Sequence, residues 1–551
     1  MKNLKRIVSA ILVLIMVTSA FTACSTNKEK DSTDTGKTDG TGTVKEEGGT
    51  DGESENPYAE KITFTMSAID AEKAGLTENG EVAANFKWLC DTFNVEFDFW
   101  PLTWSNYVDQ TRMWINSDSA PDIMMLDVAP TRYSEYLEWV DAGLLRPYDL
   151  ESYPNLKAAF DTMVTGKKFA VDNKLYAWPA AMDTSKYNFS IPQGYIYRKD
   201  WAKAVGLYKE DNIYTWDEWL TLVETVIAED PGKNGANNTI GILTGTNWAF
   251  PKYITGSIAP YLVTFEQAAD GTWSWGAASA NSLEAVKTTK DLYDRGIIWA
   301  DQPMVQDGDK DNNFAAGKLF AATAVSTTVA EMNNMRKIFE DANPEINSQE
   351  AMDLAFVKGA DGKLLTWQTN DQWSQTAMSH TVSDEKAARW QAVLDYLVSD
   401  EGYYFRNYGV KDVDWKMEGE EVICLWKQDE NGDYVNPYSN GTWPWARAGG
   451  NSDGFALISP SYPQWIRDIY LNAMDIFSDE SKTTIIPVNA DFSFYTSESY
   501  AQATSGLENE TYTKIAELLT SKDIEADWTA WVNQKLPEVQ PALEELNANV
   551  K

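Results

Sequence analysis

The chain has 551 residues, enough for two or more domains with a large hydrophobic core. Its formal net charge of −37 argues against nucleic acid and anionic membrane faces as partners, and it suits an exported protein that handles neutral or cationic ligands, although solubility alone is the simpler explanation. The single histidine, His380, excludes sites that need two, including most zinc sites, and no cofactor is expected.

The first 23 residues have the pattern of a secretory signal peptide. Lys2, Lys5 and Arg6 precede an apolar run over 7–17 that is short for a membrane span. The run ends in "FTAC", which resembles a bacterial lipobox with Phe21 in place of the usual Leu-like residue. That resemblance implies cleavage before Cys24 and a lipid on its sulfur. An uncleaved anchor helix is the alternative, and either one holds the protein on the membrane surface.

A polar segment follows the signal peptide. Residues 25–56 consist almost entirely of Gly, Ser, Thr and charged residues, without any aromatic side chain. Such a composition cannot bury a core, so we predict a disordered tether over 24–56 and a folded region that starts near residue 57.

The folded region begins with alternating strand and helix patterns. Apolar residues alternate over 61–68 and 94–102, which predicts strands, and they share one helical face over 81–93. A polar helix over 104–118 leads to a short buried strand in "PDIMML" (121–126), directly before Asp127. This order predicts a βαβ arrangement with a parallel sheet, and ligands bind beyond the carboxyl ends of such strands.

Further elements follow in the second half of the chain. Thr215 and Glu218 form a capping box that opens a helix, and helices are predicted at 281–295 and 383–399. The segment 422–438 has a polar turn, "DENGD", between apolar runs and reads as a hairpin. Cys90 lies on the apolar face of its helix as a buried thiol, and the spacing of Cys90 and Cys424 does not indicate a disulfide.

The order of several motifs is similar to that of extracellular solute-binding proteins of carbohydrate ABC importers, of the sugar-binding type. These motifs are "PDIMMLD", "EWVDAGLLRPYD", "NKLYAWPAAMD", "YIYRKDWAKAVGL", "TWDEWL", "FAAGKLFAATA" and "SDEKAARWQAVLDYLVSDEGYYFRNYGVKDVDW", and they span about residues 58–540. The stretch "YFRNYGVKDVDW" resembles the large lipoprotein branch, whose members take oligosaccharides.

The resemblance implies an α/β fold of two lobes, each with a mostly parallel sheet flanked by helices. We expect an N-terminal lobe of 57–182 and 326–374 and a C-terminal lobe of 183–325 and 375–551. Hinge crossings are expected near 181–183, 323–326 and 372–378, and ligand binding would close the lobes.

A site for a neutral sugar needs aromatic planes for stacking and planar polar groups for paired hydroxyls. Asp127 fits the second role, or it caps the next turn. Asp183 lies at the first crossing, and Trp104 follows a strand end. Trp178 stacks on ligand or fills the hinge, and core is the simpler assignment. Trp248 matches a family loop that carries a stacking aromatic residue.

Two further clusters complete the predicted ligand site. The third crossing carries the densest sugar-like constellation: Trp367, Asn370, Asp371 and Trp373. A Gly/Pro-rich loop carries Trp443, Trp445 and Arg447, either over the cleft or as plugs against the C-terminal helices. Five other tryptophans fit strands or helices and are assigned to the core: Trp273, Trp275, Trp299, Trp390 and Trp528.

Two loops resemble calcium sites in part. Asp230, Asn234 and Asn238 resemble a calcium loop of oligosaccharide-binding relatives, but Gly232 and Asn238 replace ligands there, so we expect no ion. The segment 307–318 begins like an EF-hand but ends in Lys318, and it is assigned to a solvated turn before a helix.

The resulting hypothesis is a non-catalytic, lipid-anchored, monomeric receptor on the extracellular face of a bacterial membrane. It would capture a neutral manno-, xylo- or gluco-oligosaccharide and pass it to an ABC transporter permease. A surface glycoside hydrolase is the alternative, because Trp subsites and two carboxylates about 5–10 Å apart would suffice. A polysaccharide adhesin and a peptide-binding importer component also remain open.

Overall fold

The computed structural model describes residues 58–550 except 70, 72–74, 78, 104, 129–131, 182–193, 237, 245–257, 307, 324–327, 360, 369–371, 430–431 and 439–456, and the side chains of 181 and 373. The signal peptide and tether predictions, with Cys24, lie outside this part. Asn56–Lys551 forms one compact unit. No helix among the described residues is long and apolar enough to cross a membrane.

The first sheet contains the predicted βαβ strands. Its order is β2-β1-β3-β16-β4, with β7 also paired to β16. Strands β1, β2 and β3 are parallel, whereas β16 runs antiparallel to its neighbours. The bounds are β1 Ile62–Ile69, β2 Val95–Leu102, β3 Ile123–Leu126, β4 Leu145–Arg146, β7 Ala177–Ala181 and β16 Gln372–Ser379.

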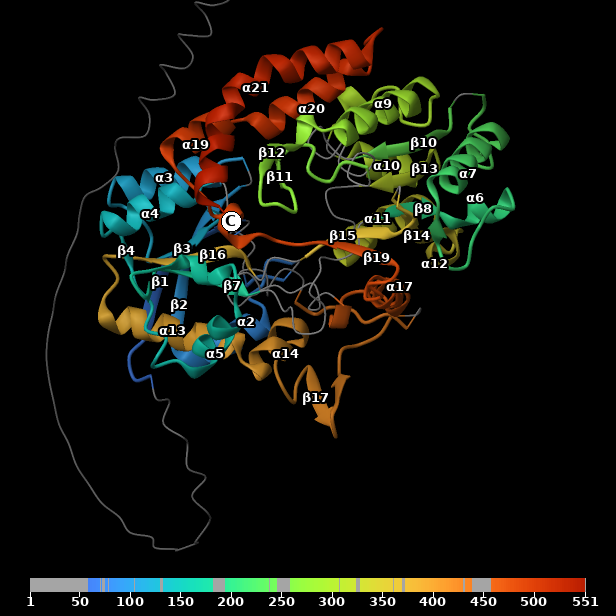
Figure 1. Cartoon of the computed structure of the whole chain (residues 1–551). Helices are drawn as coiled ribbons and strands as arrows, with labels where there is room; N and C mark the ends of the chain where they lie inside the picture. Colours follow the sequence, from blue (N-terminus) through green and yellow to red (C-terminus); the bar gives the residue numbers. More distant parts are fainter. Residues whose placement is uncertain are drawn as a thin grey trace, which may run out of the picture. The chain divides into compact units, whose positions relative to one another are not determined.

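Helices cover the first sheet with a shared aromatic and aliphatic core. Alternate side chains of β1, Ile62, Phe64 and Met66, pack in one cluster with Trp390 and Leu394 of α13. All four residues of β3 are buried, as expected for a central strand covered on both faces. The helices that pack here, drawn in Figure 1, are α2 Ala84–Phe93, α4 Tyr133–Asp141, α5 Pro154–Thr162, α13 Asp384–Val398 and α14 Asp400–Tyr408.

The second sheet has the order β10-β13-β8-β14-β9. Its bounds are β8 Tyr195–Arg198, β9 Ile213–Tyr214, β10 Ile240–Thr244, β13 Leu319–Thr323 and β14 Met352–Val357. Successive residues supply two different cores, since Tyr197 and Ala321 lie in one cluster while Ile196 and Ala322 lie in the other. This period of two places helices on both faces of the sheet.

The two faces of the second sheet are covered by different helices. One face packs α7 Trp216–Glu229, α9 Ala280–Asp294 and α21 Ile524–Asn549, and the other packs α10 Asp309–Ala315, α11 Val329–Ala342 and α17 Gln464–Phe477. The capping box of Thr215 and Glu218 at the start of α7 is confirmed. The helices predicted at 281–295 and 383–399 are confirmed as α9 and α13.

The sheets correct the predicted lobe boundaries. Strand β14 and helix α11 belong to the second sheet, although 326–374 was expected in the N-terminal lobe. Conversely, β16 belongs to the first sheet, and α13 and α14 pack against its core. The range 375–551 was expected in the C-terminal lobe. Strand β7 ends at Ala181, where the first crossing is expected, and it pairs with β16, which contains the segment 372–378 of the third expected crossing.

The hairpin predicted at 422–438 is only partly correct. The turn "DENGD" is flanked by a single antiparallel bridge between Gln428 and Tyr434. Among the described residues, a hairpin with two paired strands lies earlier, with β17 at Trp415–Glu418 and β18 at Glu421–Cys424. Cys90 and Cys424 are free thiols, and burial raises the pKa of the half-buried Cys90 to about 12.

Candidate functional site

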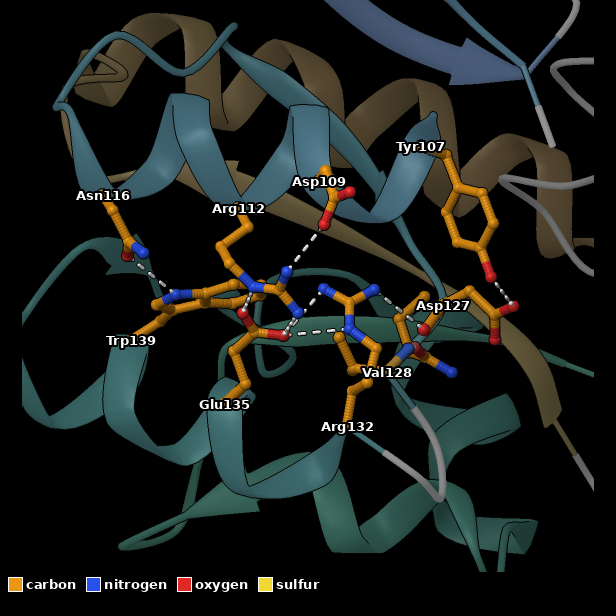
Figure 2. A network of polar contacts seen from close by, with 10 residues as sticks. Tyr107, Asp109, Arg112, Asn116, Asp127, Val128, Arg132, Glu135 and Trp139 are labelled. Atoms are coloured by element: carbon orange, nitrogen blue, oxygen red, sulfur yellow. Dashed lines mark hydrogen bonds and ion pairs between the residues drawn. The ribbon is translucent and has the colours of Figure 1, made fainter. Parts of the chain in front are cut away.

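Asp127 begins the loop that leaves β3 at its carboxyl end. Its carboxylate is half-buried and accepts a hydrogen bond from the Tyr107 hydroxyl at 3.2 Å (Figure 2). Burial, and then the Asp127 charge, raises the pKa of Tyr107, so the phenol stays protonated and keeps donating. The acidic side chain is therefore held in one direction at the position where open α/β sheets bind ligands.

A network of ion pairs between α3, Tyr107–Asn116, and α4 supports the loop that begins at Asp127. Arg132 donates to the Asp127 carbonyl oxygen at 3.4 Å and to Glu135 at 2.9 Å. Glu135 also pairs with Arg112, which donates to Asp109 at 2.8 Å (Figure 2). Because Arg132 and Glu135 are only 15% and 17% exposed, this pair is screened less than the outer ones. The network ties α3 to α4 beside the Asp127 loop.

A buried glutamine joins the same loop to β16. The Val128 N–H donates to Gln375 Oε1 at 3.0 Å, and Gln375 Nε2 donates to Gln372 Oε1 at 2.7 Å. Gln375 is fully buried, and the pairing of β16 with β7 shifts register between these two glutamines. Bulges of this kind redirect side chains and are common beside binding sites.

The second sheet repeats this device at the end of β10. The fully buried Gln302 accepts from Thr244 N at 2.9 Å and donates to Thr244 O at 3.3 Å. Thr323 pairs with Thr244 across the parallel strands. Each sheet thus has a buried glutamine that satisfies the backbone where a strand ends, after β3 in the first sheet and at β10 in the second, and sequence reasoning missed both.

Two hydroxyls at this edge of the second sheet have no hydrogen-bond partner in the described part of the chain. They are Tyr195 OH, at the start of β8, and Thr323 Oγ1, at the end of β13, and both are buried. The antiparallel register of β8 and β13, with Ile196 opposite Ala322, brings these two residues opposite each other. Buried polar atoms normally have partners, so this pair could donate to a ligand.

The predicted site residues have different locations. Trp178 is fully buried in the core of the first sheet, which corresponds to the core assignment rather than to a stacking surface. Trp367 is half-buried at the end of β15, Leu364–Trp367, opposite Ile486 of β19, Thr483–Ile486. Trp373 lies in β16. The remaining predicted ligand contacts lie outside the described residues: Trp104, Asp183, Trp248, Asn370, Asp371, Trp443, Trp445 and Arg447.

The core assignments of other tryptophans are confirmed. Trp275, Trp390 and Trp528 are at most 2% exposed, Trp273 is 5% exposed, and Trp299 is partly buried against the core. A cavity of about 440 Å³ is lined by α21 and by α19, Glu498–Thr504, and α20, Leu507–Leu518, and it contains none of the predicted ligand residues.

The loop that resembles a calcium site is satisfied by its own hydrogen bonds. The Asp230 carboxylate accepts from Thr239 Oγ1 at 2.6 Å and from the N–H groups of Asn234 and Gly235 at 3.0 and 2.8 Å. These donors lower the pKa of Asp230. A side chain at Gly232 would come within 2.7 Å of Asn234 Nδ2 and 2.9 Å of the Gly317 carbonyl oxygen. Hydrogen-bond donors therefore surround the only carboxylate of the loop. A calcium-ligating side chain at position 232 would have no room.

The segment 307–318 begins a helix rather than a long turn. Helix α10 starts at Asp309, whose carboxylate accepts from Gln306 N at 2.9 Å. No group of three or more His, Cys, Asp or Glu is arranged to hold a metal ion in the part of the chain that the structure describes.

We expect calcium to leave the stability of the protein unchanged. The melting temperature should be the same in excess calcium and in excess EDTA, because Asp230 is already hydrogen-bonded by the protein. Differential scanning calorimetry of the same sample in both buffers measures this directly. A rise in melting temperature with calcium that EDTA reverses would show that the loop rearranges to hold an ion.

Several solved structures have the same fold. No family model matches the chain, and no curated protein sequence matches it. The alginate-binding protein AlgQ2, in a structure without calcium ion, has a TM-score of 0.63 and 13% identity, over 89% of this chain and 98% of its own. The S. pneumoniae ABC-transporter substrate-binding protein FusA, in complex with kestose, has a TM-score of 0.62 and 16% identity, over 88% and 99%.

A third example comes from Bifidobacterium longum infantis. This HMO-binding, ABC-transporter-associated solute-binding protein has a TM-score of 0.62 and 15% identity, over 89% of this chain and 98% of its own. At such low identity the likeness establishes the fold. The chain has the two-lobe α/β fold of the solute-binding proteins of ABC transporters, as the order of its sequence motifs implied.

Proposed function

We propose that this protein is a non-catalytic receptor that captures an oligosaccharide and delivers it to an ABC transporter permease. The observation that carries the proposal is the polar edge of each sheet. Asp127 follows a central strand of the first sheet, while Tyr195 OH at the start of β8 and Thr323 Oγ1 at the end of the antiparallel β13 lie at one edge of the second. Sugar hydroxyls both donate and accept, so they suit a fixed carboxylate on one side and hydroxyls on the other.

The rigid support of these groups agrees with a binding role. The buried glutamines Gln375 and Gln302 fix the backbone at both edges, and the Tyr107 hydroxyl orients Asp127. Pre-organised polar groups reduce the ordering cost that a flexible sugar imposes on binding. Among the proteins with the same fold, one is named an alginate-binding protein, one is a substrate-binding protein in complex with kestose and one is named as HMO-binding, which supports a carbohydrate ligand.

The finer properties of the receptor form part of the proposal. A net charge of −37 favours a neutral glycan, such as a manno-, xylo- or gluco-oligosaccharide, over an acidic one. Trp367 and Trp373 are proposed to supply stacking planes together with Trp104, Trp248, Trp443 and Trp445. The polar contacts are proposed to include Asp183, Asn370, Asp371 and Arg447. A lipid on Cys24 would hold the monomeric receptor at the outer membrane face beside its permease.

The direct test is a melting-temperature screen with short neutral oligosaccharides. The sample is the compact unit Asn56–Lys551. A ligand that binds only the folded state should raise the melting temperature as its concentration rises. At a concentration 100 times the Kd, it adds about 2.7 kcal/mol to the free energy of unfolding. The proposal requires the sugar to remain uncleaved after overnight incubation. Cleavage would instead establish a glycoside hydrolase, and the absence of any shift across the panel would exclude a neutral-sugar receptor.

A further inference from the structure

Strongly exposed apolar side chains gather on one segment of the protein. Four of them lie between residues 413 and 435: Val413 at 65%, Met417 at 41%, Leu425 at 42% and Val435 at 53% exposure. Val82, at 60%, directly precedes Ala83, which is buried in one cluster with Trp426 of this segment. Single exposed apolar residues are ordinary, whereas exposed apolar residues that share one face mark an interaction surface, and the strand register shows which residues of this segment do so.

The β17–β18 hairpin presents an apolar face on this segment. Its register places Trp415 opposite Cys424 and Met417 opposite Val422, and both pairs lie on the same face because side chains alternate. Trp415 is buried at the base, whereas Met417 is exposed near the tip. Apolar surface that stays exposed to water does not contribute to the stability of the fold, so the exposed part of this face needs another explanation. In Figure 1 the hairpin, labelled at β17, extends beyond α14.

The tip of the hairpin is acidic. Glu418 and Glu421 are directly opposite each other, and Glu420 stands between them beside the turn residue Gly419, which has φ of 67°. Like charges in opposite positions destabilise a hairpin. Lys416 Nζ lies 2.6 Å from Glu418, which offsets one of the three carboxylates. The remaining negative charge is complementary to a surface that carries Lys or Arg.

The base of the hairpin is fixed to α14, so the exposure does not come from a loose loop. Trp415 Nε1 donates to Gly409 O at 3.0 Å, and Trp426 Nε1 donates to Tyr408 O at 2.9 Å. Asp414 accepts from Val410 N at 2.6 Å and from the Tyr438 hydroxyl. These buried contacts hold the apolar face in a defined orientation, as an interface element requires.

We propose that the β17–β18 hairpin is a docking element for the membrane-embedded permease. The matching surface of the permease would have an apolar recess bordered by basic side chains. The inference rests on the proposed function, which requires transfer to such a partner. An anionic lipid surface would repel Glu418, Glu420 and Glu421. A second copy of the chain carries the same net charge of −37, so long-range electrostatics oppose its approach to this acidic tip. Met417 is the exposed residue of this apolar face, and methionine is enriched at protein interfaces.

The test uses the full chain in cells that take up the oligosaccharide found in the melting-temperature screen. Met417→Glu combined with Val422→Glu removes the apolar face, and Glu418→Lys combined with Glu421→Lys reverses the tip while keeping like charges opposite. The control is Met304→Glu, at an apolar side chain that is 73% exposed in another part of the chain. Each purified variant is also titrated with the sugar.

We expect both double variants to bind the sugar with the wild-type Kd but to support uptake about tenfold more slowly, while Met304→Glu behaves like the wild type. A photoreactive amino acid at 417 should crosslink to the permease subunits. Wild-type uptake by both double variants would overturn the docking role, as would crosslinks only to a second copy or to lipid. Failure of the wild-type protein to bind any sugar would instead overturn the proposed function. The charge reversal remains informative if the Met417 and Val422 substitutions prevent folding.

Discussion

Replacing Asp127 with alanine will weaken oligosaccharide binding by about 10- to 100-fold. A hydrogen bond to a charged group contributes about 1.5–3 kcal/mol, and about 1.4 kcal/mol corresponds to a tenfold change in Kd. Isothermal titration calorimetry with the sugar from the screen measures the loss. The melting temperature without ligand should change little, because the hydrogen bond from Tyr107 to the half-buried carboxylate is long, at 3.2 Å.

Two further variants define what Asp127 does. Asp109→Ala is the matched control, because Asp109 belongs to the same network but is 87% exposed and touches Arg112 there. Asp127→Asn keeps the shape and removes the charge, so it should bind with an intermediate Kd. If Asp127→Ala binds sugar normally and instead melts earlier, Asp127 caps the turn after β3 and does not contact ligand.

Arg389→Met will lower the free energy of unfolding by about 2–4 kcal/mol, the largest stability effect that we expect from a single charged residue. Arg389 is 7% exposed, and its Nη1 donates to the carbonyl oxygens of Phe93, Asn94 and Glu60 at 2.8, 3.1 and 3.2 Å. Its guanidinium also lies 4.3 Å from the Tyr58 ring centroid. The substitution removes the donor to the buried Phe93 carbonyl, and an unsatisfied buried carbonyl is costlier than the loss of an average hydrogen bond, whereas the Asn94 carbonyl still accepts from the Ile62 N–H.

Arg295→Met is the control for this prediction. Arg295 pairs with Glu224 at 2.6 Å and with Asp291 at 2.9 Å, but all three side chains are substantially exposed. Ion pairs of this kind contribute about 0–1 kcal/mol, so this variant should unfold close to the wild-type denaturant midpoint. Urea unfolding of both variants measures the difference. Equal midpoints for the two variants would mean that the carbonyl groups near Arg389 find other donors.

Local patterns in the sequence predicted the elements but not their partners. The alternation of Ile62, Phe64 and Met66 is a property of adjacent residues, and so is the capping box at Thr215, and both predictions are confirmed. The lobe boundaries were wrong because nothing in the sequences of β14, "MDLAFV", and β16, "QWSQTAMS", says which sheet each strand joins. Their sheet is decided by pairing with strands far away in the chain, which periodicity does not reveal.

The same limit applies to the candidate site. Asp127 was recognisable because it follows a buried strand, and Gly232 indicated a calcium loop without its ligands. Gln375 carried no such signal, since its role depends on the Val128 N–H, 247 residues earlier. Gln302 likewise depends on Thr244, 58 residues earlier. The support of the site is therefore a tertiary property, and the amide side chains that provide it look like any polar residue in the sequence.

The position of β16 in the first sheet has a consequence for biosynthesis. Strand β3 pairs with β16 along one side, so this side stays an open edge until the chain has grown by roughly another 250 residues. At about 5–20 residues per second, translation of that length takes on the order of 10–50 s. An open central strand in a nascent chain is prone to aggregation and also keeps the chain from folding early. For a chain with a predicted secretory signal peptide, such a delay would leave β3 uncovered while the chain is being exported.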